Sequence, residues 1–242
     1  MVFAFISDIH GNASALLSVL TDIKSRNVAG IFCCGDLVNY GPDPAKVIEI
    51  IASESIPTVM GNRDREIAMD YTLCSISPGR LPEVEQAAFT WTKGQLKGEH
   101  LDFLRNLPVS LGVQLGELYA MVTHATPWSD EHYASVCDIP ALSDALRRIS
   151  ARALFFGHTH LASWSQHDQI HLVNVGSVGR PKDGDPRAAY VVFDTASYTP
   201  HVVRVAYPVE DVAEAMERAG LPRQLSDSLR CGRDYFSQLD KL

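Results

Sequence analysis

The sequence predicts a layered α/β fold of one domain, in which two sheets are faced by helices. Three observations lead to this prediction. Short apolar runs of strand length alternate with helical stretches up to residue 60. A second series of short apolar runs follows beyond residue 108. The 242 residues include 46% hydrophobic and 21% charged side chains, which is ordinary globular composition and excludes a mainly disordered chain.

The N-terminal elements have the order of a parallel βαβαβ unit with right-handed crossovers. The strands are short apolar runs, and the first of them ends in a polar cluster. Between them, apolar residues recur at the spacing of one helix face. In chain order we expect strand Val2–Ser7, helix Asn12–Arg26, strand Ala29–Cys34, helix Pro44–Ser53 and strand Pro57–Met60.

The segment Arg65–Pro108 departs from this alternation. It reads as mainly helical, and Pro78, Gly79 and Pro82 break it. We therefore expect residues 65–108 to form a helical insertion, or cap, beside the core of a single domain that covers residues 1–242.

The rest of the chain returns to strands and ends in helices. Helical spacing predicts helices at Pro140–Ser150 and Val209–Ala219, and we expect residues 208–242 to form a C-terminal helical tail. Apolar runs bounded by turn residues predict strands at Val109–Leu115, Leu118–Thr123, Ala153–Phe156, Ala162–Gln166, Ile170–Val175, Ala188–Asp194 and Pro200–Ala206.

The charge balance and the cysteines bear on partners and location. The chain has 21 Lys and Arg against 29 Asp and Glu, a net charge of −8, which disfavours binding to nucleic acid or to an anionic membrane. No apolar run approaches the roughly 18–20 residues of a membrane span, and the N-terminus lacks the regions of a signal peptide. The adjacent Cys33 and Cys34 suit buried thiols in a reducing compartment. We expect a cytoplasmic protein and leave a homo-oligomer open.

Polar side chains of metal-ligand type follow several of the predicted strands. Sites in open α/β sheets form outside the carboxyl ends of the strands, so these side chains can converge although they lie far apart in sequence. Carboxylate, imidazole and amide groups suit Mn²⁺, Fe or Zn²⁺, and there are more of them than one ion binds. This indicates two ions that share one carboxylate. The candidate ligands are Asp8, His10, Asp36, Asn62, His124, His158 and His160.

The order of the motifs along the chain is specific, although each motif alone is weak. In this order they are D-x-H-G from Asp8, G-D ending at Asp36, G-N-x-D around Asn62, His124, and G-H-x-H around His158. The order resembles the calcineurin-like metallophosphoesterase superfamily, and looks closest to its small bacterial and archaeal phosphodiesterase branch. The segment Asn174–Pro181 resembles that branch too. The resemblance implies a four-layer α/β/β/α sandwich of two mixed sheets flanked by helices.

The resemblance also implies two metal shells and a reaction. Two divalent ions, with Mn²⁺ favoured and Fe or Zn²⁺ as alternatives, make hydroxide available for in-line attack on phosphorus. The implied substrate is a small phosphorylated molecule, either a phosphodiester or a nucleotide phosphoanhydride. The implied ligands are Asp8, His10, Asp36 and His160 for the first ion, and Asp36, Asn62, His124 and His158 for the second, with Asp36 as the bridge.

One position departs from the family pattern. The commonest pattern is G-N-H-[DE], whose His is the general acid for the leaving group, and this chain has Arg63 there. A guanidinium keeps its proton near neutral pH but can clamp phosphoryl oxygens. Arg63 either contacts a substrate whose leaving group needs little protonation, such as a nucleotide polyphosphate or an aryl phosphodiester, or turns outward to pair with Asp64 or Glu66. We expect the catalytic residues to be Asn62, Arg63, Asp64 and His124.

Other functions stay open on the sequence. A serine/threonine-type protein phosphatase or a nuclease would use the same fold, and a non-catalytic metal-binding module could keep the fold without the chemistry. A steep salt dependence of binding to DNA or RNA would indicate the nuclease. Two further side chains have two interpretations each: Arg180 meets a phosphate or caps a surface carboxylate, and His132 lines the pocket or lies in a surface loop.

Overall fold

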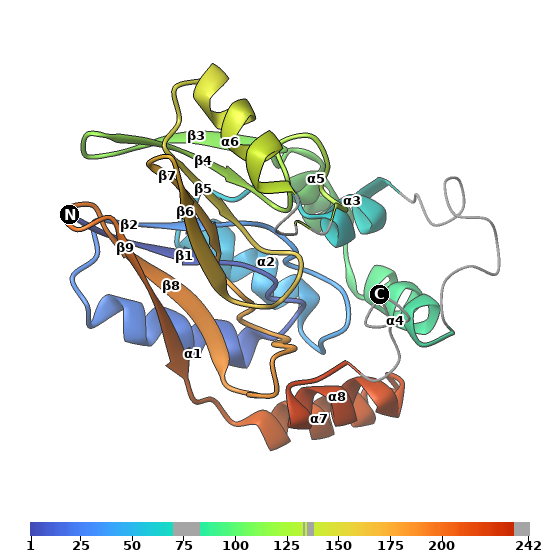
Figure 1. The fold of residues 1–242 in the computed structure, drawn as a ribbon. Coiled ribbons are helices and arrows are strands. Elements are labelled where there is room, and N and C mark those ends of the chain that lie inside the picture. The colour runs from blue at the N-terminus through green and yellow to red at the C-terminus, as the bar shows by residue number, and fades with distance from the viewer. Residues whose placement is uncertain (70–82, 133, 135–137, 235–242) are drawn as a thin grey trace.

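The computed structural model describes residues 1–69, 83–132, 134 and 138–234, and its strands form two sheets that lie face to face (Figure 1). The breaks expected at Pro78, Gly79 and Pro82 lie outside these residues, as does the end of the expected tail. Within the described parts of the chain, every helix is too short or too polar to span a bilayer.

The first sheet joins the N-terminal strands to the last strands of the chain, in the order β2-β1-β8-β9. β1 (Val2–Ile6) pairs in parallel with β2 (Gly30–Cys33), and helix α1 (Ala13–Lys24) connects the two, as the sequence predicts. On its other side β1 pairs antiparallel with β8 (Ala188–Asp194), which pairs antiparallel with β9 (Thr199–Val205). The sheet is therefore mixed.

The second sheet is also mixed and has the order β3-β4-β5-β7-β6. β3 (Ser110–Leu115) and β4 (Leu118–Thr123) form an antiparallel hairpin. β4, β5 (Ala153–Phe156) and β7 (Ile170–Asn174) run in parallel, and β6 (Ser163–His167) returns antiparallel beside β7. These strands lie at or within a residue or two of the positions that the apolar runs predict.

Aromatic side chains fill the space between the two sheets. The rings of Phe5 and Phe155 stack with their centroids 3.6 Å apart, and Phe193 meets Phe155 edge to face. Successive residues of a strand point to opposite faces, so Ala4 and Ile6 of β1 pack instead against the helices behind the first sheet. β1 is therefore buried on both faces.

Helices cover the outer faces of both sheets and complete four layers (Figure 1). On the first sheet the apolar core joins α1, α2 (Pro44–Ser53), α7 (Val209–Arg218) and α8 (Arg223–Cys231) to β1 and β8. On the second sheet α6 (Ile139–Arg148) packs through its apolar face. The α/β/β/α sandwich that the motifs imply is confirmed.

The expected insertion, which in sequence lies between β2 and β3, is helical in its described part, as predicted. It contains α3 (Asn62–Met69), α4 (Glu83–Gln95) and α5 (Gly98–Arg105). α3 begins at Asn62, earlier than expected, so a candidate metal ligand stands in the first turn of a helix. This placement fixes the side chain more firmly than a loop would.

The strand expected at residues 57–60 is wrong. The segment makes a single parallel bridge to β2, at Thr58. Pro57 has no N–H to donate to a ladder, and the N–H of Met60 donates instead to the carbonyl of Pro108 at 2.7 Å. These two residues limit the pairing to one bridge.

The C-terminal helical tail is shorter than expected in its described part. α8 ends at Cys231, and Gly232 has a φ of 60°, the left-handed conformation that glycine adopts at little cost. The carbonyl of Gly232 accepts a hydrogen bond from the N–H of Gly184 at 2.8 Å. Gly232 is thereby held against the loop between β7 and β8.

Candidate metal centre

The loops that follow β1 and β2 hold each other in a strained geometry. Asp8, His10 and Asp36 have φ values of 52°, 49° and 55°, a left-handed conformation that is costly for residues other than glycine. The N–H of Asp8 donates to the carbonyl of Gly35 at 2.9 Å, and that of His10 donates to the carbonyl of Asp36 at 3.0 Å. These bonds offset the strain and turn the side chains toward one point.

The loop after β5 brings two histidines to the same point. His158 and His160 also have positive φ values, 67° and 61°. The N–H of His158 donates to Asp8 Oδ2 at 2.9 Å. A Cβ on the preceding Gly157 would lie 2.1 Å from the Oγ of Ser7, so only glycine permits this close approach of the loops.

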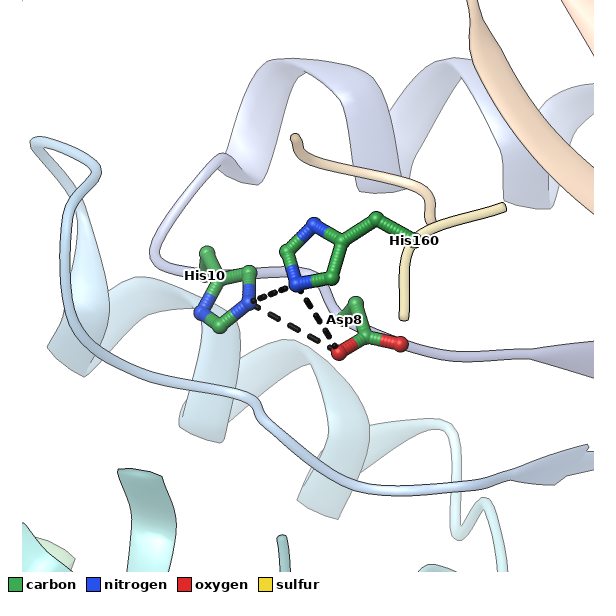
Figure 2. A group of neighbouring side chains, drawn as sticks. All are labelled: Asp8, His10 and His160. Carbon is green, nitrogen blue, oxygen red and sulfur yellow. Dashed lines mark hydrogen bonds and ion pairs between the residues drawn. The ribbon is translucent and has the colours of Figure 1, made fainter. Parts of the chain in front are cut away.

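A first group of ligand atoms consists of Asp8, His10 and His160, all buried (Figure 2). Nε2 of His160 lies 3.3 Å from Asp8 Oδ1, and Nε2 of His10 lies 3.7 Å from the same oxygen. The two Nε2 atoms are 3.2 Å apart. Three donor atoms that point at one small volume form a cation site.

A second group adjoins the first through Asp36. Asp36 Oδ2 lies 3.6 Å from His10 Nε2 in the first group and 3.4 Å from His124 Nε2. His124 Nε2 in turn lies 3.0 Å from Asn62 Oδ1 and 3.2 Å from His158 Nδ1. Asp36 therefore stands between two clusters of donor atoms. The structure brings together every residue that the sequence predicts as a metal ligand.

A backbone carbonyl fixes the ring of each histidine in the site. A carbonyl only accepts, so the ring nitrogen that faces it must carry the proton, and in the neutral imidazole the other nitrogen keeps its lone pair for a cation. The pairs are His10 Nδ1 with Val38 at 3.0 Å, His124 Nδ1 with Cys34 at 2.8 Å, His158 Nε2 with Glu131 at 3.1 Å, and His160 Nδ1 with Arg180 at 2.5 Å.

The arrangement fits divalent ions. Asp8 Oδ1 is buried and has no hydrogen-bond partner among the described residues. A buried carboxylate oxygen without a partner is costly unless a cation binds it. The lone pairs of His10 and His160 point at each other from 3.2 Å, which a cation between them would reconcile. The donors are oxygen and imidazole nitrogen, which suit Mn²⁺, Fe or Zn²⁺.

The electrostatics of the second group favour a cation beside Asp36. Burial raises the pKa of Asp36, but the charges of His124 and His10 outweigh it and hold that pKa below its usual range. Burial lowers the pKa of His124, and Asp36 more than reverses this, raising it to about 10. Burial and the charge of His124 lower the pKa of His158 to about 4. His158 is therefore a neutral ligand near pH 7, and a cation beside Asp36 would take the place of the proton on His124.

Asp64 does not join the ligand atoms but supports them. Its Oδ1 accepts from the N–H groups of Leu37 at 2.8 Å and Val38 at 3.3 Å, and its Oδ2 accepts from Gly61 at 3.0 Å. Burial and the charge of Asp36 raise the pKa of Asp64 to about 7. The carboxyl group ties the loop of Asp36 to the start of α3.

The guanidinium of Arg63 pairs with two glutamates and lies 5.5 Å from the ring centroid of Tyr40. Its Nη1 lies 2.9 Å from Glu66 and its Nη2 lies 3.1 Å from Glu85 of α4. The pairing with Glu66 was one of the two interpretations of this residue, whereas Asp64 bonds backbone N–H groups instead. The N–H of Arg63 donates to Asp36 Oδ1 at 2.8 Å, so its backbone does contact the bridging carboxylate.

Tyr40 and Glu85 adjoin the site, and of the two only Glu85 was not predicted near it. Tyr40 follows Asp36 in a loop that is expected to border the metals or to form a simple turn, and its ring meets the edge of His10, with the centroids 5.1 Å apart. Glu85 lies on α4, and the local sequence does not indicate where this helix packs. His132 bonds Asp138 at 3.0 Å with its side chain 41% exposed, as expected of a surface loop.

Two adjoining groups of carboxylate, imidazole and amide donors, at the strand ends of an α/β/β/α sandwich, form the metal-binding arrangement of a two-metal hydrolase. A sequence profile of the calcineurin-like phosphoesterase superfamily domain matches residues 1–198. The chain therefore belongs to this superfamily, as its motifs predict, and is a hydrolase that binds divalent metal.

Individual relatives agree with this assignment. The uncharacterized protein MJ0912 of Methanocaldococcus jannaschii is 31% identical over 251 residues, which cover 96% of this chain and 98% of that protein. Phosphodiesterase YfcE of Escherichia coli is 28% identical over 204 residues, 80% of this chain and 88% of that one. The crystal structure of a metallophosphoesterase from Sphaerobacter thermophilus is 30% identical, covers 96% of this chain and 99% of its own, and has a TM-score of 0.77.

Proposed function

We propose that the protein hydrolyses phosphodiesters or nucleotide phosphoanhydrides with two divalent ions. Mn²⁺ is the favoured ion, and Fe or Zn²⁺ are the alternatives. The position of Asp36 carries this proposal. One oxygen of this carboxylate lies 3.6 Å from a ring nitrogen of the first group and 3.4 Å from one of the second. A carboxylate in this position suits a bridge between two ions, which is the arrangement of two-metal hydrolases.

The proposed ligands follow the two groups of donor atoms. Each histidine is held by a backbone carbonyl, so each offers one defined nitrogen. Asn62 and His124 belong to the second group of donor atoms, and we assign them as catalytic. The first ion is assigned to Asp8, His10, Asp36 and His160, and the second to Asp36, Asn62, His124 and His158.

The bound ions supply Lewis acidity, which lowers the pKa of water and stabilises charge on the phosphoryl oxygens. The chain itself determines where this acidity acts. Asp64 and the backbone N–H of Arg63 hold the loop and the carboxylate of Asp36 in place. Burial of the ligands strengthens every charge interaction in the site, because the local dielectric constant is low.

The leaving group is expected to depart with little protonation. Arg63 stands where the family pattern has an acidic histidine, and a guanidinium does not release its proton near neutral pH. Glu66 and Glu85 hold that guanidinium through ion pairs. Aryl phosphodiesters and phosphoanhydrides have leaving groups that are stable as anions, so we propose them over alkyl monoesters.

Partners and location complete the proposal. The likeness to a protein named a phosphodiesterase supports a small phosphorylated substrate. The net charge of −8 supports such a substrate over nucleic acid. The thiols of Cys33 and Cys34 are fully buried, which supports the cytoplasm as the location. We assign the activity to a single domain of residues 1–242.

A hydrolysis assay with defined metals tests the proposal. Protein stripped with a chelator receives Mn²⁺, Zn²⁺ or Mg²⁺ and is given bis-p-nitrophenyl phosphate, p-nitrophenyl phosphate, a dinucleoside polyphosphate and a phosphoserine peptide. We expect metal-dependent turnover, fastest on the diester or the polyphosphate, that Asp36→Asn abolishes. Asp144→Asn, which removes the same charge from an exposed ion pair on α6, is the matched control. Alkyl monoesters as the best substrates by kcat/KM would contradict the leaving-group argument.

A further inference from the structure

Two cationic side chains beside the metal centre, Arg180 and Lys182, both pair with the carboxylate of Asp234, which follows α8. Asp234 Oδ2 lies 2.9 Å from Nη2 of Arg180 and 3.2 Å from Nζ of Lys182. The side chains of Arg180, Lys182 and Asp234 are 8%, 13% and 2% exposed. Largely buried charges of this kind need partners, so the two cations form a built site for an anion.

Arg180 joins this pair of cations to the metal centre. Its carbonyl accepts the hydrogen bond that fixes the ring of His160. Its guanidinium lies over the ring of Tyr40, 4.2 Å from the centroid, and that ring meets the edge of His10.

A cavity lies between the metal centre and the C-terminal helices. It is a small hollow that is partly open to solvent. His10, Tyr40 and Arg180 line one side, and apolar residues of α7 and α8 such as Met216 and Leu225 line the other. Arg180 therefore lies at a hollow that also borders the metal ligand His10.

The contact of Asp234 is not needed to hold the last two helices. α7 and α8 pack through buried side chains of the main core. Arg230 of α8 also pairs with Glu210 and Glu217 of α7, at 2.7 Å each. Asp234 follows the left-handed turn at Gly232 and therefore lies beyond the end of α8.

We propose that Arg180 and Lys182 form a second anion subsite, which binds a non-reacting phosphate of the substrate, and that Asp234 occupies this subsite until the substrate displaces it. An arginine fork beside a lysine charge suits a phosphate at least as well as a carboxylate. This inference rests on the proposed function and narrows it to substrates with a second phosphate, such as nucleotide phosphoanhydrides. While Asp234 occupies the subsite, the second phosphate cannot bind there. The apparent affinity for such a substrate is therefore the intrinsic affinity multiplied by the fraction of time that the subsite is open.

Asp234→Asn tests the subsite. It removes the competing charge, so we expect the KM for a dinucleoside polyphosphate to fall about tenfold. The KM for bis-p-nitrophenyl phosphate, which has one phosphate, should not change. Lys182→Gln should raise the KM for the polyphosphate alone. Asp183→Asn is the matched control, because it removes a neighbouring carboxylate that pairs with Arg204 instead.

A merely structural role of Asp234 predicts another result. Asp234→Asn would then lower Tm and leave both KM values unchanged or shift them together, and this outcome overturns the proposal. If the wild type turns over neither substrate with any metal, the proposed function is contradicted, whereas the subsite proposal is not. Calorimetry with pyrophosphate then decides the subsite: tighter binding to Asp234→Asn than to wild type supports it, and equal binding overturns it.

Discussion

The metal centre and the rim around it are built in different ways. In the centre, short polar side chains stand on loops at strand ends, and backbone carbonyls fix their rings. On the rim, Arg63 pairs with Glu85, 22 residues away, and Arg180 pairs with Asp234, 54 residues away. Local sequence therefore encodes the chemistry, whereas long-range pairing sets which cations a substrate can reach.

The largest expected effect comes from the centre, at Asp8. Asp8→Asn weakens the first group of ligands, and we expect kcat/KM to fall about 10³-fold. In metal-free protein the same change removes a buried carboxylate oxygen that has no described partner. We expect the metal-free Tm to rise by about 2–4 °C, a gain of about 1 kcal/mol. Kinetics and thermal unfolding of the metal-free variant check this: kcat/KM should fall while Tm rises. A lower metal-free Tm would show that Asp8 is structural.

The rim is expected to determine the leaving group. Arg63→His restores the residue of the common family pattern, and an imidazole can donate a proton near neutral pH. We expect kcat/KM for an alkyl phosphate ester to rise about 10²-fold while that for an aryl diester stays nearly the same. Rates on both substrates between pH 5 and 9 check this, with Arg63→Gln as the control that cannot donate. An equal change on both substrates would contradict the expected role.

The support beneath the centre should give a smaller effect. Asp64→Ala leaves the N–H groups of Leu37, Val38 and Gly61 without their acceptor, and these hold the loop of Asp36. We expect metal affinity to fall about 10–100-fold, as for other residues that orient metal ligands. Calorimetric titration with Mn²⁺ measures this. Asp64→Asn keeps one oxygen as acceptor and should lose less; an equal loss in both variants would point to the charge and not to the hydrogen bonds.

The smallest effect is expected where centre and rim meet, at Tyr40. Its ring contacts both the ring of His10 and the guanidinium of Arg180. Tyr40→Leu removes the face on which that cation lies, and we expect a loss of about 0.5–2 kcal/mol in the free energy of unfolding. Tyr40→Phe keeps the ring and should unfold near the wild-type Tm. A similar loss in both would assign the effect to the hydroxyl group.

The same contrast explains what the sequence could predict. Asp8, Asp36 and His158 come shortly after the ends of apolar runs, so strand ends and residue types were enough to place them at one site. The fold class followed for the same reason, since period and length of apolar runs are local signals. The prediction of a strand at residues 57–60 was wrong because the N–H of Met60 donates to the carbonyl of Pro108. No local sequence pattern indicates this contact.

The rim could not be predicted because no sequence pattern marks the partners of its charged side chains. Arg63 had two interpretations on the sequence, and only the position of α4 brings Glu85 to it. Arg180 was likewise open between a phosphate and a carboxylate. The structure shows it paired with Asp234, after a helix whose end depends on the left-handed turn at Gly232.

Metal stoichiometry tests the central claim, which is that Asp36 bridges two ions. Metal-free protein is loaded with Mn²⁺, freed of excess ion, and analysed by elemental mass spectrometry and calorimetry, for the wild type and for Asp36→Asn. The account predicts two ions per chain in the wild type and loss of both high-affinity sites in the variant, because both groups contain this carboxylate. One ion per chain in the wild type, or two ions retained by Asp36→Asn, would contradict it.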